Sequence, residues 1–336
     1  MPKTVSIIMP VKHVDDSFRQ SIQRIAVCSP PPYEIIIVID GKSDQPAPET
    51  GIENIQLAQL EESAGPAAAR NKGAQIATGE ILLFVDSDVI LPINIVSQIN
   101  TAFKNDLHPI AVFGSYDENP VEQNTISQYK NLFHFYTHQN SQSDAFTFWT
   151  GCGGILREFF IELGGFSEQY KCPSIEDIEL GYRIKKSGHT IVLDKSIQVT
   201  HLKRWTFLSL IKTDFCYRAV PWSRLILQYG TMTNDMNINL TNRLSVISSM
   251  LILFFLFLSL TNKFFILAIF ITFGFLLYIN KDLFLFFLRK KGRFFLLQAI
   301  LLQYIYYIVS GTAFILVGVQ FYCGKTMRFA AQKSRS

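Results

Sequence analysis

The sequence has few of the features that mark a secreted protein held together by disulfide bonds. It contains 5 cysteines in 336 residues, and no two of them form a Cys-x-x-Cys pair. Because an odd number of scattered cysteines cannot all pair within one chain, we predict reduced thiols and a cytosolic setting. No charged and then apolar leader precedes the first predicted strand, so we also expect no cleaved signal peptide.

Charged residues are missing from two long apolar stretches near the end of the sequence. Residues 244–260 and 264–279 contain none, and as helices they would each span roughly 24–26 Å, slightly less than a ~30 Å hydrocarbon core. A third apolar stretch covers residues 294–322. Basic residues beside membrane spans stay in the cytoplasm, and five of them lie between the second and third stretches: Lys281, Arg289, Lys290, Lys291 and Arg293.

We therefore predict about three transmembrane spans within residues 244–324 of a multi-pass protein of the cell (inner) membrane. The domain that precedes the spans would be cytoplasmic. Residues 206–243 mix aromatic and basic side chains around Pro221, which is typical of interfacial amphipathic helices. Residues 325–336 form a basic tail, which three spans would place outside the cell unless the third stretch bends back near Ser310 and Gly311. The net charge of +4 favours a membrane surface and no nucleic acid as the partner of these basic residues.

The first 205 residues have the pattern of an α/β domain. An apolar run, residues 5–9, ends at Pro10, helical spacing of apolar residues follows, and a second apolar run ends at Asp40. A strand, a helix and a strand with short connections predict a βαβ unit with parallel strands. Asp40 could accept a hydrogen bond from a base or a ribose, or it could stabilise a turn.

Asp86 and Asp88 follow a third apolar run, residues 81–85. Ligands of open α/β sheets bind at the carboxyl ends of strands, and alternate residues of a strand point to the same side. Two carboxylates on one side suit Mg²⁺ or Mn²⁺ and a diphosphate. The alternative is a strand followed by an Asx-type turn.

Small residues between Ser63 and Gly73 predict a helix that starts close against the sheet. Its amino-terminal amides, with Arg70 or Lys72, would favour a phosphate, although an Ala-rich helix with solvated basic residues has the same pattern. Residues 117–143 are polar apart from a helix-like segment, 126–136, and could form a loop over a cleft.

Glycines are dense in residues 148–154 and again in residues 164–166, where they would let the backbone approach a ligand or permit bulges. Glu176 and Asp177 begin a predicted helix, so they are either caps or a general base for a sugar hydroxyl. Two strands are expected at 190–193 and 197–200. His201 follows them and could complete a metal site or be structural.

Six motifs, in this order, resemble the family 2 inverting glycosyltransferases of GT-A fold over residues 4–205. They are residues 5–10, Ile39-Asp40-Gly41, residues 65–73 with Ala69-Arg70-Asn71, Asp86-Ser87-Asp88, Gly164-Gly165-Phe166 and Glu176-Asp177. The resemblance implies an α/β fold, with a GT-A (nucleotide-diphospho-sugar transferase, Rossmann-like) domain in residues 1–205 followed by an all-α membrane region.

The resemblance also implies roles for single residues. Pro10, Asp40 and Arg70 would hold the nucleoside of a nucleotide-diphosphate sugar, with a UDP-sugar favoured. Asp86 and Asp88 would hold the diphosphate through Mg²⁺ or Mn²⁺, Gly153 and Gly154 would line the donor sugar and acceptor, and Asp177 would be the catalytic base.

The segment from His201 to Trp205 is similar to the Gln-x-x-Arg-Trp signature of processive members, with His in place of Gln. This substitution leaves a metal role for His201 open. Acceptor-binding or auxiliary roles are expected for Trp149, Glu176, Arg204 and Trp205.

Three functions fit these observations. The first is a membrane-bound, metal-dependent transferase that moves a sugar to a hydroxyl of a lipid, lipid-linked or glycan acceptor. The second is a processive polysaccharide synthase, for which three spans are few. The third is a non-catalytic membrane protein that senses nucleotide sugars, against which the intact Asp86, Asp88 and Asp177 argue.

Overall fold

The fold is that of a computed structural model, which describes residues 1–42 and 54–333, with side chains up to Cys323. The chain divides into two compact units, Met1–Arg204 and Trp205–Ser336. Each unit is described by itself.

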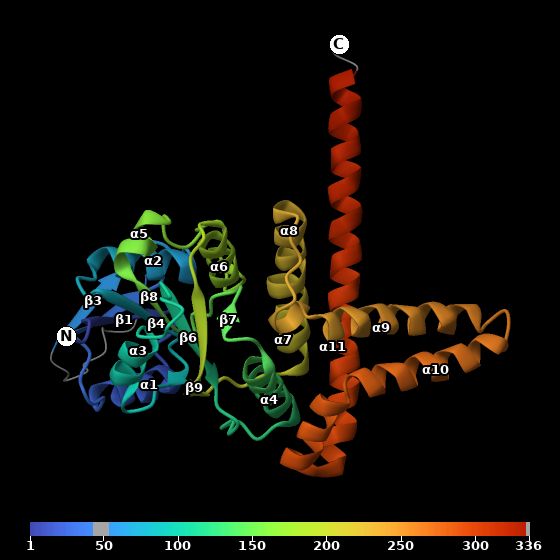
Figure 1. The fold of residues 1–336 in the computed structure, drawn as a ribbon, viewed down its shortest axis with the longest axis horizontal. Helices are drawn as coiled ribbons and strands as arrows, with labels where there is room; N and C mark the ends of the chain where they lie inside the picture. Colours follow the sequence, from blue (N-terminus) through green and yellow to red (C-terminus); the bar gives the residue numbers. More distant parts are fainter. Residues whose placement is uncertain (43–53, 334–336) are drawn as a thin grey trace. The chain divides into compact units, whose positions relative to one another are not determined.

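A mixed β-sheet forms the centre of the first unit (Figure 1). Its strands follow the order β3-β2-β1-β4-β8-β6-β9-β5, and β7 pairs with β9. Neighbours are parallel among β1 (Val5–Val11), β2 (Glu34–Ile39), β3 (Ile55–Gln59) and β4 (Ile81–Val85). Every residue of β1, β2 and β4 is buried, as expected for strands that are covered on both faces. The parallel βαβ unit predicted from the sequence is confirmed.

The other half of the sheet contains the antiparallel pairs. β8 (Cys152–Leu156) is antiparallel to β4 and to β6 (Ala111–Tyr116), whereas β6 is parallel to β9 (Ile191–His201). Two short strands, β5 (Val89–Ile90) and β7 (Asp144–Ala145), pair with β9. The two strands expected at 190–193 and 197–200 are one strand, β9. The polar residues between its apolar halves lie at a register shift opposite Gly114, whose missing Cβ would be 2.4 Å from the carbonyl oxygen of Ile197.

In the described residues of the first unit, six helices surround the sheet: α1 (Asp16–Ala26), α2 (Pro66–Ile76), α3 (Ile95–Ala102), α4 (Thr125–Asn140), α5 (Arg157–Glu162) and α6 (Glu176–Lys186). Helix α4 confirms the helix-like segment expected at 126–136 and extends it at both ends. Asn124 caps it by accepting a hydrogen bond from the Ser127 amide, and Tyr129 and Leu132 are buried. An amino-terminal cap and a buried face stabilise a helix in this polar segment.

A buried carboxylate joins the amino-terminal ends of the strands. Glu34, which is 5% exposed, accepts hydrogen bonds from Ser6 Oγ (2.6 Å), Gln56 Nε2 (2.8 Å) and the backbone amides of Thr78 (2.7 Å) and Gly79 (3.2 Å). Burial opposes ionisation, but these donors outweigh it and lower the pKa of Glu34. These hydrogen bonds of Glu34, which we call the clip, connect β1, β2 and β3 to the turn before β4.

The second unit is helical. It contains α7 (Phe207–Lys212), the π-helix η1 (Thr213–Ala219), α8 (Val220–Tyr229), a short 3₁₀ turn (Met236–Ile238), α9 (Leu240–Leu258), α10 (Phe264–Ile279) and α11 (Lys281–Lys333). Helix α11 is interrupted at Gly292, where φ is +79°. By length and composition alone, two helices in the described part of the chain could cross a membrane, Leu240–Leu258 and Lys281–Cys323, and α10 is a shorter apolar helix.

Polar side chains connect the apolar helices of this unit. Asn280 Nδ2 donates a hydrogen bond to Ser245 Oγ (2.8 Å), and Asn280 Oδ1 accepts one from the Tyr307 hydroxyl (2.7 Å). Ile252, Leu276 and Tyr307 pack together beside this network. Buried polar groups therefore have partners where α9, α10 and α11 meet.

Candidate active site

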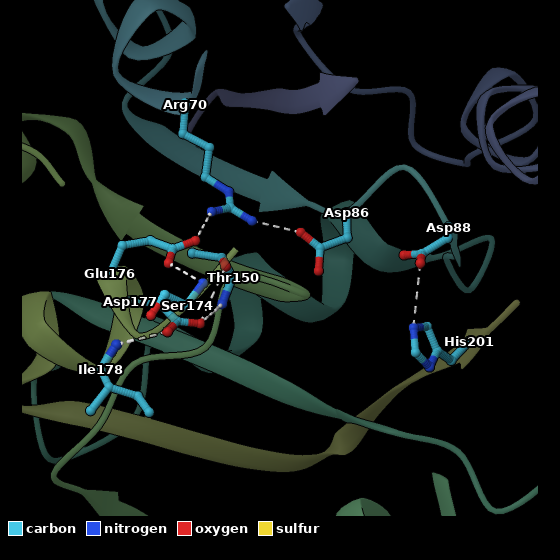
Figure 2. Close-up of polar contacts among 9 residues, drawn as sticks. All are labelled: Arg70, Asp86, Asp88, Thr150, Ser174, Glu176, Asp177, Ile178 and His201. Atoms are coloured by element: carbon cyan, nitrogen blue, oxygen red, sulfur yellow. Dashed lines mark hydrogen bonds and ion pairs between the residues drawn. The ribbon is translucent and has the colours of Figure 1, made fainter. Parts of the chain in front are cut away.

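The two predicted metal-binding aspartates lie in a turn and not on a strand. β4 ends at Val85, and the Asp86 carbonyl accepts a hydrogen bond from the Val89 amide (3.3 Å). Strand alternation therefore does not orient the two side chains. Asp86 faces Arg70 and Asp88 faces His201 (Figure 2).

Arg70 of α2 connects two separate parts of the site. Its Nη2 lies 2.7 Å from Asp86 Oδ1 and its Nη1 lies 2.8 Å from Glu176 Oε1. The residue is 4% exposed. Burial alone would lower the pKa of Arg70, but the carboxylates of Asp86, Glu176 and Asp177 raise it. Both terminal nitrogens are thus used within the protein, and a contact of Arg70 with the nucleoside stays a prediction.

Glu176 and Asp177 begin α6 in different surroundings (Figure 2). Glu176 is 3% exposed, and its Oε2 accepts a hydrogen bond from the Ser174 amide (2.9 Å). Asp177 is half-buried. Its Oδ2 accepts from the amide (3.2 Å) and the hydroxyl (3.3 Å) of Thr150, and its Oδ1 accepts from the Ile178 amide (2.8 Å). Because Glu176 is already paired with Arg70, Asp177 is the better candidate for a general base.

His201 ends β9 and faces the second aspartate. Its Nε2 lies 3.5 Å from Asp88 Oδ2, and its ring stacks on Tyr116 with centroids 4.2 Å apart and planes 11° apart. Trp149 packs edge-on against the same tyrosine at 4.8 Å. Sequence reasoning missed Tyr116, although it ends a strand that runs parallel to β9. It also missed Thr150, whose neighbours Trp149 and Gly151 were noted.

The electrostatics differ between the two aspartates. Burial raises the pKa of Asp86, and the charge of Asp88 adds to this effect, although Arg70 opposes it. Burial also opposes ionisation of Asp88, but His201 and Lys203 outweigh it and lower the pKa of that carboxyl. Asp88 is therefore the more acidic of the pair.

The donor atoms at this turn fit a hard divalent cation. The contacts with Arg70 and His201 use one oxygen of each aspartate, so the other oxygen of each could bind Mg²⁺ or Mn²⁺. Within the described residues, no three His, Cys, Asp or Glu side chains converge as a metal site. Two carboxylates suffice when phosphate oxygens complete the shell, and His201 as a further ligand stays a prediction.

Asp40 follows β2 and accepts hydrogen bonds at the start of α2. The donors are the amides of Ala64 (2.7 Å) and Gly65 (3.1 Å) and the Ser63 hydroxyl (3.1 Å). Asp40 therefore holds the residues just before α2, and a phosphate at the amino-terminal amides of the helix stays a prediction. Pro10 is buried in β1 one residue before the strand ends, and its contact with the nucleoside stays a prediction.

The predicted donor-lining glycines lie in β8. Gly153 pairs with Phe84, and a Cβ on it would lie 2.2 Å from the Trp149 carbonyl oxygen. Gly154 faces the opposite side, where a Cβ would touch Phe103 at 3.3 Å. Gly153 therefore permits the close approach of the Trp149 segment, and contact of either glycine with a donor stays a prediction.

The last two predicted auxiliary residues lie at the boundary of the units. The Arg204 side chain is 73% exposed, with Nε 3.9 Å from Glu122. Trp205 is the first residue of the second unit. The roles expected for both residues stay predictions.

Comparison with known proteins finds similarity to glycosyltransferases in the first half of the chain. Residues 6–164 match the family described as Glycosyl transferase family 2. The uncharacterised glycosyltransferase YibD of Escherichia coli (strain K12) is 31% identical over 108 residues, which are 31% of each chain. The glucosyl-dolichyl phosphate glucuronosyltransferase of Haloferax volcanii is 25% identical over 104 residues, 30% of this chain and 33% of the relative. The matched part thus spans about a third of these relatives.

A solved structure can be aligned with much of this chain. The mannosyltransferase of Pyrobaculum calidifontis in complex with GDP-Man and Mn²⁺ aligns with a TM-score of 0.47 and 16% identity. The alignment covers 68% of this chain and 63% of that one.

Proposed function

Because the chain contains a glycosyltransferase family 2 domain of the GT-A type, we propose that it is a membrane-bound inverting glycosyltransferase. It would move a sugar from a nucleotide-diphosphate sugar, with a UDP-sugar favoured, to a hydroxyl of a lipid, lipid-linked or glycan acceptor. One observation carries this proposal. Arg70 joins Asp86 to Glu176, the neighbour of the base candidate Asp177. The two predicted metal-binding aspartates, Asp86 and Asp88 (the acid pair), and the predicted base therefore lie in one site.

The mechanism assigns the proton transfer to Asp177. The carboxylate takes the proton of the acceptor hydroxyl while the hydroxyl oxygen attacks the anomeric carbon from the face opposite the nucleotide. The bond from that carbon to the diphosphate oxygen breaks, the diphosphate leaves with the electron pair, and the configuration inverts. Thr150 holds Oδ2 of Asp177 through its amide and hydroxyl, which orients the carboxylate for this transfer.

Asp86 and Asp88 would hold Mg²⁺ or Mn²⁺, which when bound neutralises charge on the departing diphosphate. His201 would either join them or orient Asp88 through its contact with Oδ2. In either role, His201→Gln should lower Mn²⁺ affinity, by roughly 10–100-fold if the residue only orients Asp88.

The membrane assignment rests on composition. Two helices of the second unit are long and apolar enough to span a bilayer, and the name of one relative states that it acts on a dolichyl phosphate. These observations favour a lipid-linked acceptor. The second candidate, a processive polysaccharide synthase, is supported by Arg204 and Trp205, and the length of the product made from a supplied donor separates the two.

A donor screen tests the proposal. The purified protein in detergent is heated with a panel of sugar nucleotides, each with and without Mn²⁺, and the best donor is then used in a transfer assay. We expect one donor to raise the melting temperature only with Mn²⁺. A protein that binds no sugar nucleotide in the presence of Mn²⁺ would contradict the proposed function.

Asp88→Asn provides the matching site variant. Loss of the charged ligand should weaken Mn²⁺-dependent donor binding by roughly 10–100-fold and should slow transfer as well. Asp194→Asn is the control, because Asp194 accepts hydrogen bonds from Ser196 in a strand irregularity of β9. Unchanged donor affinity in Asp88→Asn would remove Asp88 from the metal site.

A further inference from the structure

We propose that Arg70 and Glu176 are positioning residues, which together set the base Asp177 relative to Asp86 of the acid pair. The inference rests on the proposed function. It concerns how the base reaches its place, and it assigns neither Arg70 nor Glu176 a contact with the substrate.

The pair lies behind the site. The side chains of Arg70 and Glu176 are 5% and 4% exposed, whereas that of Asp86 is 32% exposed. The guanidinium carbon of Arg70 lies 5.7 Å from the centre of the Phe166 ring. The middle of this arrangement is therefore closed to solvent, whereas Asp86 and the half-buried Asp177 are partly accessible. Figure 2 shows Arg70 between Asp86 and Glu176.

The chemistry of the bridge requires a guanidinium. Nη1 and Nη2 point in fixed directions and each holds a different carboxylate, so one rigid plane joins the end of β4 to the start of α6. A lysine ammonium is a single flexible point charge and cannot reproduce this geometry. A buried ion pair contributes little net stability once the cost of removing both charges from water is counted. What the Arg70–Glu176 pair provides is therefore a fixed geometry.

Glu176 connects the Arg70 guanidinium to the backbone that carries the base Asp177. Its Oε1 is held by Arg70 and its Oε2 by the Ser174 amide, which fixes the backbone immediately before Asp177. Thr150 holds Asp177 from the other side. Without Glu176, the first turn of α6 keeps the hydrogen bond between Thr150 and Asp177. It loses the hydrogen bond through which Glu176 links it to Arg70, and thereby to Asp86. A displacement of the base by about 1 Å can cost roughly 10²-fold in rate.

Glu176→Gln is a sharp probe because both Glu176 oxygens accept hydrogen bonds from the protein. A glutamine must therefore place its NH₂ group against either Arg70 or the Ser174 amide, two donors facing each other. Either placement breaks one of the two hydrogen bonds through which Glu176 connects Arg70 to the backbone before Asp177, and the volume of the side chain stays nearly unchanged.

The experiment combines Glu176→Gln, Arg70→Lys and the double variant in the full-length protein. Glu34→Gln is the matched control, because Glu34 is an equally buried carboxylate of the same unit, hydrogen-bonded to residues outside the site. Binding of UDP, and separately GDP, with Mn²⁺ is measured by calorimetry. Single-turnover transfer is measured with the best sugar nucleotide from the donor screen, below the melting temperature of every variant.

For Glu176→Gln we expect UDP or GDP affinity within about threefold of wild type and transfer slowed by roughly 10–100-fold. The double variant should be no slower than the slower single variant, because residues that act as one unit are not additive. Glu34→Gln should match wild type in both measurements. If Arg70→Lys does not fold, the split between affinity and rate in Glu176→Gln decides alone.

Three results would overturn the inference: near-normal transfer by Glu176→Gln, an equal loss of nucleotide affinity and rate in that variant, or the same slow transfer in Glu34→Gln. Failure of the proposed function is recognised separately. In that case wild type itself neither binds UDP or GDP with Mn²⁺ nor transfers a sugar.

Discussion

Glu176 and Asp177 are adjacent carboxylates whose partners make them chemically different. Glu176 forms an ion pair with Arg70, whereas Asp177 is half-buried and accepts hydrogen bonds from Thr150 and from the Ile178 amide. A group that accepts a proton from a substrate must be reachable and must not be held by a strong cation. This difference supports Asp177 as the base.

Asp177→Asn tests that assignment. The amide keeps the shape of the side chain and removes the proton acceptor, so donor affinity should survive while transfer falls by roughly 10²–10⁴-fold. Asp15→Asn is the matched control, because Asp15 caps α1 by accepting a hydrogen bond from the Phe18 amide and asparagine caps almost equally well. Single-turnover transfer and calorimetry measure the two effects. An Asp177→Asn enzyme that turns over like Asp15→Asn would show that Asp177 is a helix-terminal acid only.

At the scale of elements, the clip at Glu34 explains how the strands that carry the site are held at their other end. The folded state lowers the pKa of Glu34. Stability from such a shift is present above the unfolded-state pKa of the group and is lost as the pH falls through the lower, folded-state pKa.

Glu34→Gln should therefore destabilise the protein by roughly 1–3 kcal/mol at pH 7, because its amide meets several donors. The difference from wild type should shrink as the pH falls below about 4.3, the ordinary value for glutamate. Urea unfolding at several pH values measures it. A difference that does not change with pH would mean that the charge of Glu34 is not what stabilises the clip.

The start of α2 depends on a glycine. Gly65 has φ of +93°, its amide donates to Asp40, and a Cβ there would lie 2.5 Å from the carbonyl oxygen of Lys171. Gly164 has φ of +79°, and a Cβ there would have nothing within 4 Å. An alanine at Gly164 would therefore introduce backbone strain without a steric clash.

Gly65→Ala should cost more than Gly164→Ala. We expect a loss of roughly 1–2 kcal/mol for Gly164→Ala from strain alone, and roughly 2–4 kcal/mol for Gly65→Ala, where a backbone clash is added. Urea unfolding measures both. Equal losses would show that the Lys171 segment moves away at little cost.

At the scale of the whole molecule, the arrangement of charge predicts how the chain crosses a membrane. The basic residues around Gly292 are exposed, and basic segments remain in the cytoplasm. The turn between α9 and α10 has Lys263 as its only charged residue. This pattern predicts that α9 and α10 form an out-and-back pair.

Single cysteines test this topology after Cys172, Cys216 and Cys323, the exposed cysteines, are replaced by serine. The buried Cys28 and Cys152 can remain, since burial raises the pKa of both thiols, that of Cys152 to about 12, and keeps them unreactive. We expect a membrane-impermeant thiol reagent on intact cells to label Asn262→Cys and to spare Lys104→Cys and Lys291→Cys. Gly292 is avoided because its φ of +79° disfavours a side chain. Labelling of Lys291→Cys from outside would overturn the topology.

Local pattern was enough for much of this protein. Runs of apolar residues ending at a proline or an acid predicted β1, β2 and β4, and the order of motifs predicted the GT-A fold, which is confirmed. These features are readable because burial periodicity and turn chemistry act over a few residues. The composition of the last third likewise predicted apolar helices, since a long uncharged run excludes an ordinary soluble surface.

Only the tertiary structure decided which side chains meet. Arg70 and Glu176 are 106 positions apart, and Tyr116 reaches His201 because the sheet places β6 beside β9. A pairing of this kind depends on strand order, and the order β1-β4-β8-β6-β9 does not follow the chain. The local periodicity of the sequence therefore could not predict which side chains meet.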